Sequence, residues 1–255
     1  MNKTVIPFVL ISLSLFLTVT SCDIFNSSDD EDEIESAVEF PDGIHEGAWE
    51  YISHEMLEII EEDLEMPIFR GDNPPRFPHI IEKRTKSQGD EMVFDTYHIS
   101  PVVLIASSVP NDPHQIGTSY PDTYLRIYNQ DPVNHTVSLD VYEEGTGFFH
   151  DPAAYIMGDD GFFTIMSTLL GNYFGHDEIV GSAFYSGYLG QEAIADLHYN
   201  YFMIDNAGDD AYIPNNTGRS MFDEWGVSEL TTWPDAGPEK STEENFHYFF
   251  QYTGK

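Results

Sequence analysis

Alternation of apolar and polar side chains, with a period of two residues, is the feature that most constrains the fold of this chain. It is clearest at residues 136–142, where Val137, Leu139 and Val141 point one way and polar side chains the other. Because successive side chains of a strand lie on opposite faces, this pattern predicts a half-buried β-strand. Similar patterns predict strands at residues 92–98, 102–107, 124–128, 162–168, 179–186, 197–204, 220–223 and 246–252.

Turn-forming residues separate the predicted strands. Asn129-Gln130-Asp131-Pro132, Gly158-Asp159-Asp160-Gly161 and Asn206-Ala207-Gly208-Asp209 combine residue types that favour turns. Short strands at this spacing, with no second helical pattern between them, predict a mainly β fold. We therefore expect an antiparallel β-barrel or β-sandwich, built from residues 40–255 as a single domain.

One amphipathic helix is expected ahead of these strands, at residues 46–64. Apolar side chains recur there at helical spacing and acidic side chains lie between them, as on a helix with one buried face. Pro67 follows shortly after the pattern and is consistent with its end. The expected apolar stripe consists of Trp49, Ile52, Met56, Ile59 and Ile60.

A short export leader is expected at residues 1–21. Lys3 provides a positive charge, and residues 5–17 form an apolar run that is too short to span a bilayer comfortably. The following Val19-Thr20-Ser21-Cys22 resembles the lipobox of bacterial lipoproteins. The resemblance implies cleavage before Cys22 and a lipid on its sulfur, which would anchor the protein to a membrane. Cys22 is the only cysteine, so the mature chain can form no internal disulfide.

Residues 22–39 are expected to form an acidic, flexible tether. The run at residues 29–33 resembles the surface-export signal of Bacteroidota lipoproteins, whereas Asp23 resembles an inner-membrane retention signal. Gly71-Asp72-Asn73-Pro74-Pro75 and Thr217-Gly218-Arg219-Ser220 make the chain similar to uncharacterised Bacteroidota surface lipoproteins. We therefore expect the protein in the cell envelope, at the outer membrane and facing outward.

Gly47-Ala48-Trp49 resembles the Gly-x-Trp motif that lies near the first strand of lipocalins. The resemblance implies a closed, lipocalin-like barrel. Because Trp49 also fits the helical stripe, the motif leaves both the closed barrel and the open sandwich as alternatives.

The chain is strongly acidic, with a formal net charge of -35 from 45 acidic and 10 basic residues. Such a surface repels nucleic acid and anionic lipid headgroups, which excludes both as expected partners. The 41% of hydrophobic residues favours a folded core over disorder. Adaptation to high salt, binding of divalent cations and a cation-crosslinked surface layer all fit the charge. The even spread of carboxylates favours the first, a halophilic protein.

The sequence contains no residue spacing typical of a catalytic site. It has neither the His-Glu-x-x-His pattern of zinc hydrolases nor the Gly-x-Ser-x-Gly elbow of serine hydrolases. We therefore expect no enzyme and no cofactor except calcium. Hard oxygen ligands and a turn glycine share one short loop, as calcium coordination prefers, although a hydrated turn is the explanation that turn-residue statistics favour. The calcium candidates are Asp205, Asn206, Asp209 and Asp210.

Aromatic residues gather in the central part of the predicted β region. Such residues could line a site for an apolar or carbohydrate ligand, or could simply form the core of a sheet. The candidates for the lining are Phe163, Phe184, Tyr199 and Tyr201. We expect a lipid-anchored envelope protein with a non-enzymatic, ligand-binding β domain. The alternatives are a structural or adhesive component that binds envelope proteins through its acidic surface with divalent cations, and a hydrolase with an unrecognised carboxylate site.

Overall fold

The computed structural model describes residues 43–44, 47–48, 52–77, 82–85, 91–145, 147–173, 176–205, 214–234 and 249–250. The chain divides into two units, Met1–Glu39 and Phe40–Lys255, and all described residues belong to the second unit. None of the helices formed by these residues has the length and hydropathy of a bilayer-spanning helix. The predicted leader, Cys22 and the tether lie outside the described residues.

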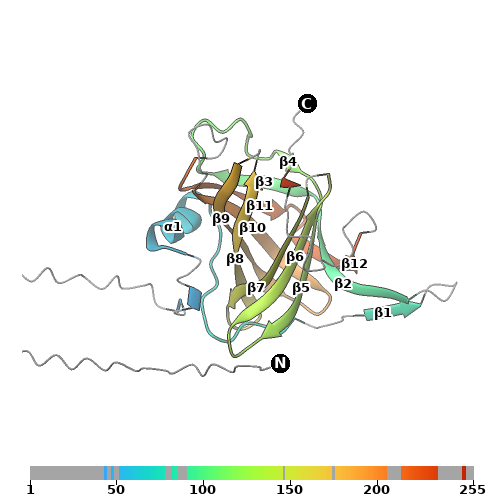
Figure 1. Ribbon diagram of the computed structural model, residues 1–255. Coiled ribbons are helices and arrows are strands. Elements are labelled where there is room, and N and C mark those ends of the chain that lie inside the picture. Colours follow the sequence, from blue (N-terminus) through green and yellow to red (C-terminus); the bar gives the residue numbers. More distant parts are fainter. Residues whose placement is uncertain are drawn as a thin grey trace, which may run out of the picture. The chain divides into compact units, whose positions relative to one another are not determined.

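Eight antiparallel strands close into a β-barrel (Figure 1). The ring closes because β12 pairs with β10 through Val227 and Ala195, and with β2 through Leu230 and Tyr97. This architecture confirms the predicted mainly β, antiparallel fold and decides between its two forms in favour of a barrel. In order around the ring, the strands are β2 (Glu91–Ile99), β5 (Thr123–Asp131), β6 (Thr136–Glu143), β7 (Gly147–Met157), β8 (Phe162–Tyr173), β9 (His176–Leu189), β10 (Ala193–Asp205) and β12 (Val227–Thr232).

Shorter strands extend the sheet beyond the ring. The first half of β10 pairs with β12, whereas its second half pairs with β11 (Thr217–Asp223). Next to β11 lie β3 (Val102–Ser107) and then β4 (Ser119–Tyr120). The two remaining strands, β1 (Glu82–Thr85) and β13 (Phe249–Phe250), pair with β2 and β8.

The strand at residues 102–107 has the predicted bounds, but β7 and β12 were not predicted as strands. In β7 a proline and polar residues interrupt the alternation. The strand bulges at Pro152 and Ala153, because Val137 pairs with Ala154 whereas Leu139 pairs with Asp151. A bulge places two residues opposite one and so hides the period of two.

A helix covers one outer face of the barrel. It begins with α1 (His54–Glu58) and continues as the π-helical segment η2 (Ile59–Asp63), so the described helix starts later than the predicted residue 46. Ser53 caps it by accepting a hydrogen bond from the Met56 backbone nitrogen at 3.1 Å, which satisfies a free donor of the first turn. Gly47 and Ala48, the described part of the lipocalin-like motif, form a 3₁₀ turn and not a strand.

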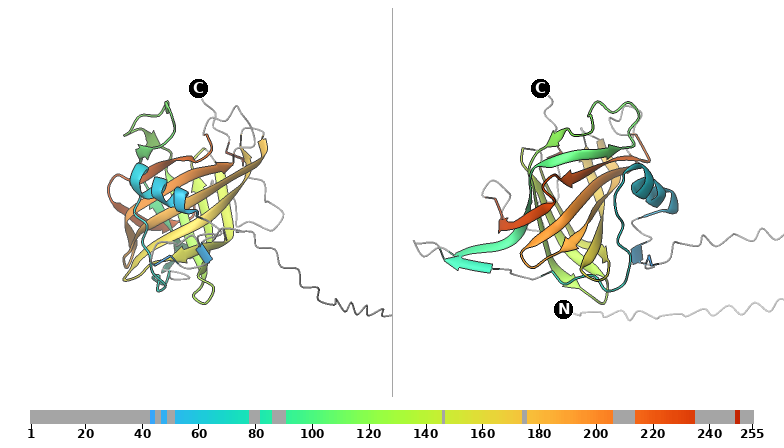
Figure 2. Two further views of the ribbon diagram at one scale, coloured as in Figure 1. Left: turned by 90° about the vertical axis from the view of Figure 1, so that its left-hand side faces the viewer. Right: turned by 180° about the vertical axis from the view of Figure 1, so that it is seen from behind.

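The helix packs on the outer face of β8, β9 and β10, as the left view of Figure 2 shows. Its buried side chains include Met56, Ile60 and Leu64, and they share one apolar cluster with Phe184 and Phe202 from the strands. Where the helix covers these three strands, both of their faces are therefore buried, one by the helix and one by the barrel interior.

Residues 69–77, the plug segment, close one end of the barrel (Figure 1). The Phe77 ring packs edge-on against Phe163 at 5.0 Å inside the barrel. Gln130 holds the segment from β5, because its side chain accepts from the Phe77 backbone nitrogen at 3.0 Å and donates to the Pro75 carbonyl at 3.0 Å. We call this the plug end of the barrel.

Two glycines allow the plug segment to approach the turn between β7 and β8. Gly158 donates a backbone hydrogen bond to the Gly71 carbonyl at 3.1 Å, and Asn73 donates one to the Gly158 carbonyl at 3.0 Å. A Cβ atom at Gly71 would lie 2.8 Å from the Gly158 carbonyl oxygen, and both glycines have positive φ angles. The predicted irregular stretch at residues 71–75 is thus the backbone that seals the plug end.

Candidate ligand-binding site

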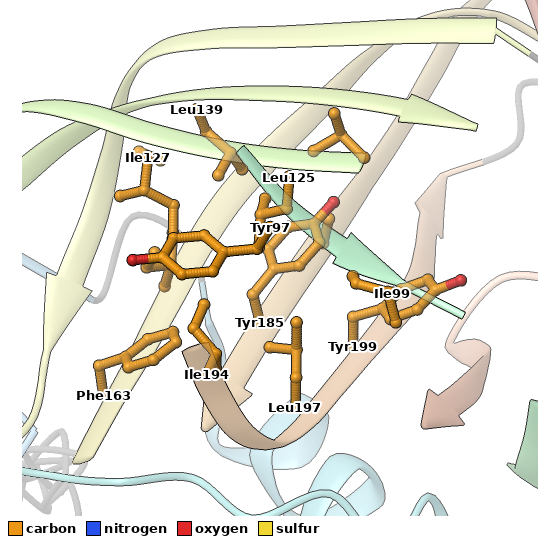
Figure 3. Packing of buried hydrophobic residues seen from close by; sticks show 14 of the residues in the cluster. Tyr97, Ile99, Leu125, Ile127, Leu139, Phe163, Tyr185, Ile194, Leu197 and Tyr199 are labelled. Carbon is orange, nitrogen blue, oxygen red and sulfur yellow. The ribbon is translucent and has the colours of Figure 1, made fainter. Parts of the chain in front are cut away.

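Three tyrosines from neighbouring strands face the barrel interior. Tyr185 of β9 pairs directly with Tyr199 of β10, and Tyr201 lies two residues further on the same face. The Tyr185 and Tyr199 ring centroids are 6.0 Å apart, and those of Tyr199 and Tyr201 are 5.7 Å apart. Figure 3 shows Tyr185 and Tyr199 among the aliphatic side chains of the interior.

A carboxylate lies among these rings at the end of the barrel opposite the plug. Glu143 is the last residue of β6 and shares the inward face of Val137, Leu139 and Val141. The Tyr201 hydroxyl donates to Glu143 Oε1 at 2.7 Å. Glu143 is largely buried and keeps 9% of its surface accessible. We call this the Glu143 end of the barrel.

Burial perturbs the titration of these groups. It raises the pKa of the Glu143 carboxyl, and the hydrogen bond from Tyr201 offsets part of that rise. Burial, followed by the nearby Glu143 charge, also raises the pKa values of Tyr185, Tyr199 and Tyr201. All three tyrosines therefore keep their protons at physiological pH and offer hydroxyl groups as neutral donors and acceptors.

The tyrosine hydroxyls have different partners. Tyr199 shares a hydrogen bond of 3.2 Å with the hydroxyl of Thr123. The Tyr185 hydroxyl is fully buried and forms no hydrogen bond of standard geometry, although it lies close enough to Tyr201 for that residue to lower its pKa. The Glu143 end thus combines one buried carboxylate with hydroxyls that are only partly satisfied.

Apart from Asp151, which pairs with the inward-facing Leu139 and accepts a hydrogen bond from Ser167, the rest of the interior is mainly apolar. Leu125 and Leu139 are fully buried between the Glu143 end and the plug end, where Phe163 and Phe77 meet, and Ile99 lies beside Tyr199 (Figure 3). Few polar groups at one end of an apolar enclosure are typical of sites for small organic molecules.

The loop between β3 and β4 is fastened to the Glu143 end by an ion pair. Arg219, which pairs with Tyr201 across β10 and β11, donates to both carboxylate oxygens of Asp112, at 2.7 and 2.9 Å. Burial alone would raise the pKa of Asp112, but the hydrogen bonds from Arg219, Ser107 and the His114 backbone hold it at about 2. The positive charge of Arg219 is therefore neutralised by this loop.

The structure brings together two of the four aromatic candidates. Tyr199 and Tyr201 line the Glu143 end, whereas Phe163 also faces inward but lies beside Phe77 at the plug end. Phe184 faces the other way, under the helix. It neighbours Tyr185 in sequence, and the alternation of a strand places neighbours on opposite faces.

Sequence reasoning missed Glu143, Tyr185 and Thr123 as members of this site. A signal for Glu143 was present, because it continues the inward series of alternate positions that begins at Val137. A carboxylate in phase with an apolar strand face is unusual and marks a position worth testing for function.

The predicted calcium site falls largely outside the described residues. Asp205 ends β10 and pairs with Val180, whereas Asn206, Asp209 and Asp210 are not described. Within the described ranges there is no group of three or more side chains suited to hold a metal ion.

Comparison with known proteins gives one structural likeness to report. No protein-family model and no curated protein sequence matches the chain. A solved structure described as a "putative outer membrane protein" from Bacteroides fragilis has 12% sequence identity to it and a TM-score of 0.31. The match covers 58% of this chain and 65% of that chain, which is slightly less than two thirds of its length.

Proposed function

We propose that the chain is a lipid-anchored protein of the cell envelope, displayed at the outer membrane, whose barrel binds a small organic ligand without catalysis. The observation that carries the binding proposal is the Glu143–Tyr201 hydrogen bond inside a mainly apolar barrel. Burying a carboxylate costs free energy, which makes a role in recognition the most economical explanation.

The two ends of the barrel support a direction of entry. Phe77 and the plug segment fill one end, where Phe77 is 7% exposed. At the other end, the inward-packing side chains of Tyr120 and Tyr201 keep accessible surface. We therefore propose that the ligand enters at the Glu143 end and places its apolar part towards Leu125 and Leu139.

The anchor part of the proposal is supported by the sequence, through the lipobox-like segment that ends at Cys22. Mass spectrometry of the protein from its native membrane tests it. We expect a mature chain that begins at Cys22 and carries the mass of diacylglycerol. A chain that retains residues 1–21, or an unmodified Cys22, contradicts the anchor.

Binding is tested by thermal unfolding of the mature chain with Cys22→Ser, which omits only the lipid. A ligand that binds the native state raises Tm in a saturable way. Hexyl compounds and simple sugars serve as probes of the apolar and the sugar-like class. The Tm rise should shrink in Tyr201→Phe, which removes a hydroxyl from the Glu143 end, and persist in Tyr188→Phe, which changes a hydroxyl on the outer face.

A second candidate function is attachment to an envelope protein, favoured by a row of apolar side chains on the outer face. Phe162, Tyr188, Ala195 and Val227 are direct cross-strand neighbours on β8, β9, β10 and β12. Phe162 and Tyr188 are 41% exposed, Val227 is 46% exposed, and Trp225, two residues earlier in the chain, is 75% exposed. Contiguous exposed apolar side chains mark interaction surfaces.

The charges around this row favour a basic partner. Exposed carboxylates flank it, namely Asp159, Asp160, Glu192, Asp196, Glu224 and Glu229. A photo-crosslinker at position 227 should therefore capture a discrete envelope protein in cells, and Phe162→Ser should abolish the product. Position 133, where Val133 is 83% exposed in another turn, is the matched control. Equal capture at both positions contradicts this function.

A further inference from the structure

The buried acidic residues differ sharply in how well they are satisfied. Among the described residues, Asp140 accepts from His150 Nδ1 at 2.6 Å and lies 3.8 Å from an Arg126 nitrogen. Asp223 accepts from the Ser228 hydroxyl at 2.9 Å and the Trp225 backbone nitrogen at 3.1 Å. Glu143 has one partner, the Tyr201 hydroxyl. An ionised carboxylate accepts about four hydrogen bonds, so Glu143 retains most of its capacity.

The free groups at the Glu143 end are acceptors more than donors. The Tyr201 proton is already donated to Glu143, and the Tyr199 and Thr123 hydroxyls share one bond. What remains is the second oxygen of Glu143 and the hydroxyl of Tyr185, which has no partner of standard geometry. A ligand that satisfies this set must donate hydrogen bonds to the carboxylate.

The local charge is negative and uncompensated. Glu143 and Asp151 both raise the pKa of Tyr185 through their charge, after the larger effect of burial. Arg219 faces the same side of the sheet, but Asp112 binds it through two hydrogen bonds. Arg126 lies on the outer face, where Asp95 at 3.0 Å and the Trp233 ring at 4.6 Å hold it. Neither Arg219 nor Arg126 is therefore available to neutralise Glu143.

We infer that the ligand of this barrel carries a protonated amine, which Glu143 binds among the rings of Tyr185, Tyr199 and Tyr201. This inference rests on the proposed ligand-binding function and names the chemical class of its ligand. An ammonium group supplies both the missing charge and the missing donors, and aromatic faces attract cations. A carboxylate ligand would instead meet Glu143 as a like charge in a buried site, which is strongly unfavourable.

Calorimetric titration of the mature chain with Cys22→Ser tests the inference. The probes are hexylammonium, hexan-1-ol and hexanoate, which share one alkyl chain and differ in the charge of the headgroup. Glucosamine and glucose form the corresponding pair for a sugar-like ligand. We expect the amine of a pair to bind at least about tenfold more tightly than its neutral analogue, and hexanoate not to bind.

Variants assign the selectivity to a residue. Glu143→Gln keeps an acceptor for Tyr201 but removes the charge, so hexylammonium should no longer bind more tightly than hexan-1-ol. Glu144→Gln is the matched control, because Glu144 is the next residue, is exposed and bonds Tyr124 on the outer side. Hexan-1-ol binding by a variant shows that its barrel is intact. If a variant fails to fold, the relative affinities of the wild type for the three alkyl probes still test the inference.

The outcomes separate the inference from the function beneath it. If hexan-1-ol or hexanoate binds as tightly as hexylammonium, the amine inference is wrong and ligand binding stands. If none of the alkyl or sugar probes binds, both are wrong. If Glu143→Gln keeps the amine preference, the assignment to Glu143 is wrong.

Discussion

We expect Phe77→Ala to lower the free energy of unfolding by about 3–5 kcal/mol, the usual cost of deleting a buried phenylalanine ring. Phe77 is 7% exposed, and its ring packs edge-on against Phe163 and Tyr97, with ring centroids 5.0 and 6.4 Å apart. Its removal leaves a cavity at the plug end that the strands cannot fill without distorting the closed barrel. Because small domains are stable by only about 5–15 kcal/mol, the loss is a large fraction of the total.

Urea unfolding followed by circular dichroism measures this loss. The ionic strength must be held constant, because a net charge of -35 makes stability depend on screening. Phe162→Ala is the matched control: it deletes the same ring at a 41% exposed position and should cost roughly 1 kcal/mol. A double-mutant cycle between Phe77 and Phe163 should give a coupling of about 0.5–1.5 kcal/mol. Equal losses for Phe77→Ala and Phe162→Ala would refute the plug as part of the core.

Three further substitutions test other parts of the fold. The folded-state pKa of Asp112, about 2, lies below its unfolded value, so its contribution to stability is present at neutral pH and is lost as the pH falls towards 2. The free energy of unfolding of Asp112→Asn, measured at decreasing pH, should therefore fall less steeply than that of the wild type. Ser53→Ala should cost about 1 kcal/mol in urea unfolding by removing the cap of α1, with no change in the slope against urea. Gly158→Ala should lower Tm far more than Gly117→Ala, because a Cβ at Gly158 would lie 2.1 Å from the Phe162 carbonyl oxygen whereas Gly117 has open space.

The fold class was predictable because several strands carry polar side chains on their outer face, even where these are buried, as Ser138 and Asp140 are. In β6, Val137, Leu139 and Val141 alternate with residues on the outer face, so the period of two survives in the sequence. Closure into a barrel was not predictable. It depends on the pairing of Leu230 with Tyr97, which lie far apart in the chain, and an open sandwich shows the same alternation.

The site was less predictable because the parts of β8, β9 and β10 that lie under the helix are buried on both faces. The helix covers Met166, Phe184 and Phe202 on one side, while Tyr185 and Tyr199 face the interior on the other. Aromatic residues are therefore consecutive in these strands, and no alternation tells an inward ring from an outward one. This is why Phe184 stood beside Tyr199 and Tyr201 as a candidate, although it faces the opposite side of the sheet.

Glu143 lowers the stability of this barrel, and we explain its presence by the proposed binding function. A glutamine at this position would accept the same hydrogen bond from Tyr201 without the cost of a buried, unpaired charge. The other buried carboxylates hold structure together, since Asp140 binds His150 and Asp223 fixes a tight turn through Trp225. Within the described part of the chain, Glu143 links β6 to another strand only through the Tyr201 hydroxyl. A buried carboxylate with few structural contacts is best explained by a ligand that forms its remaining hydrogen bonds.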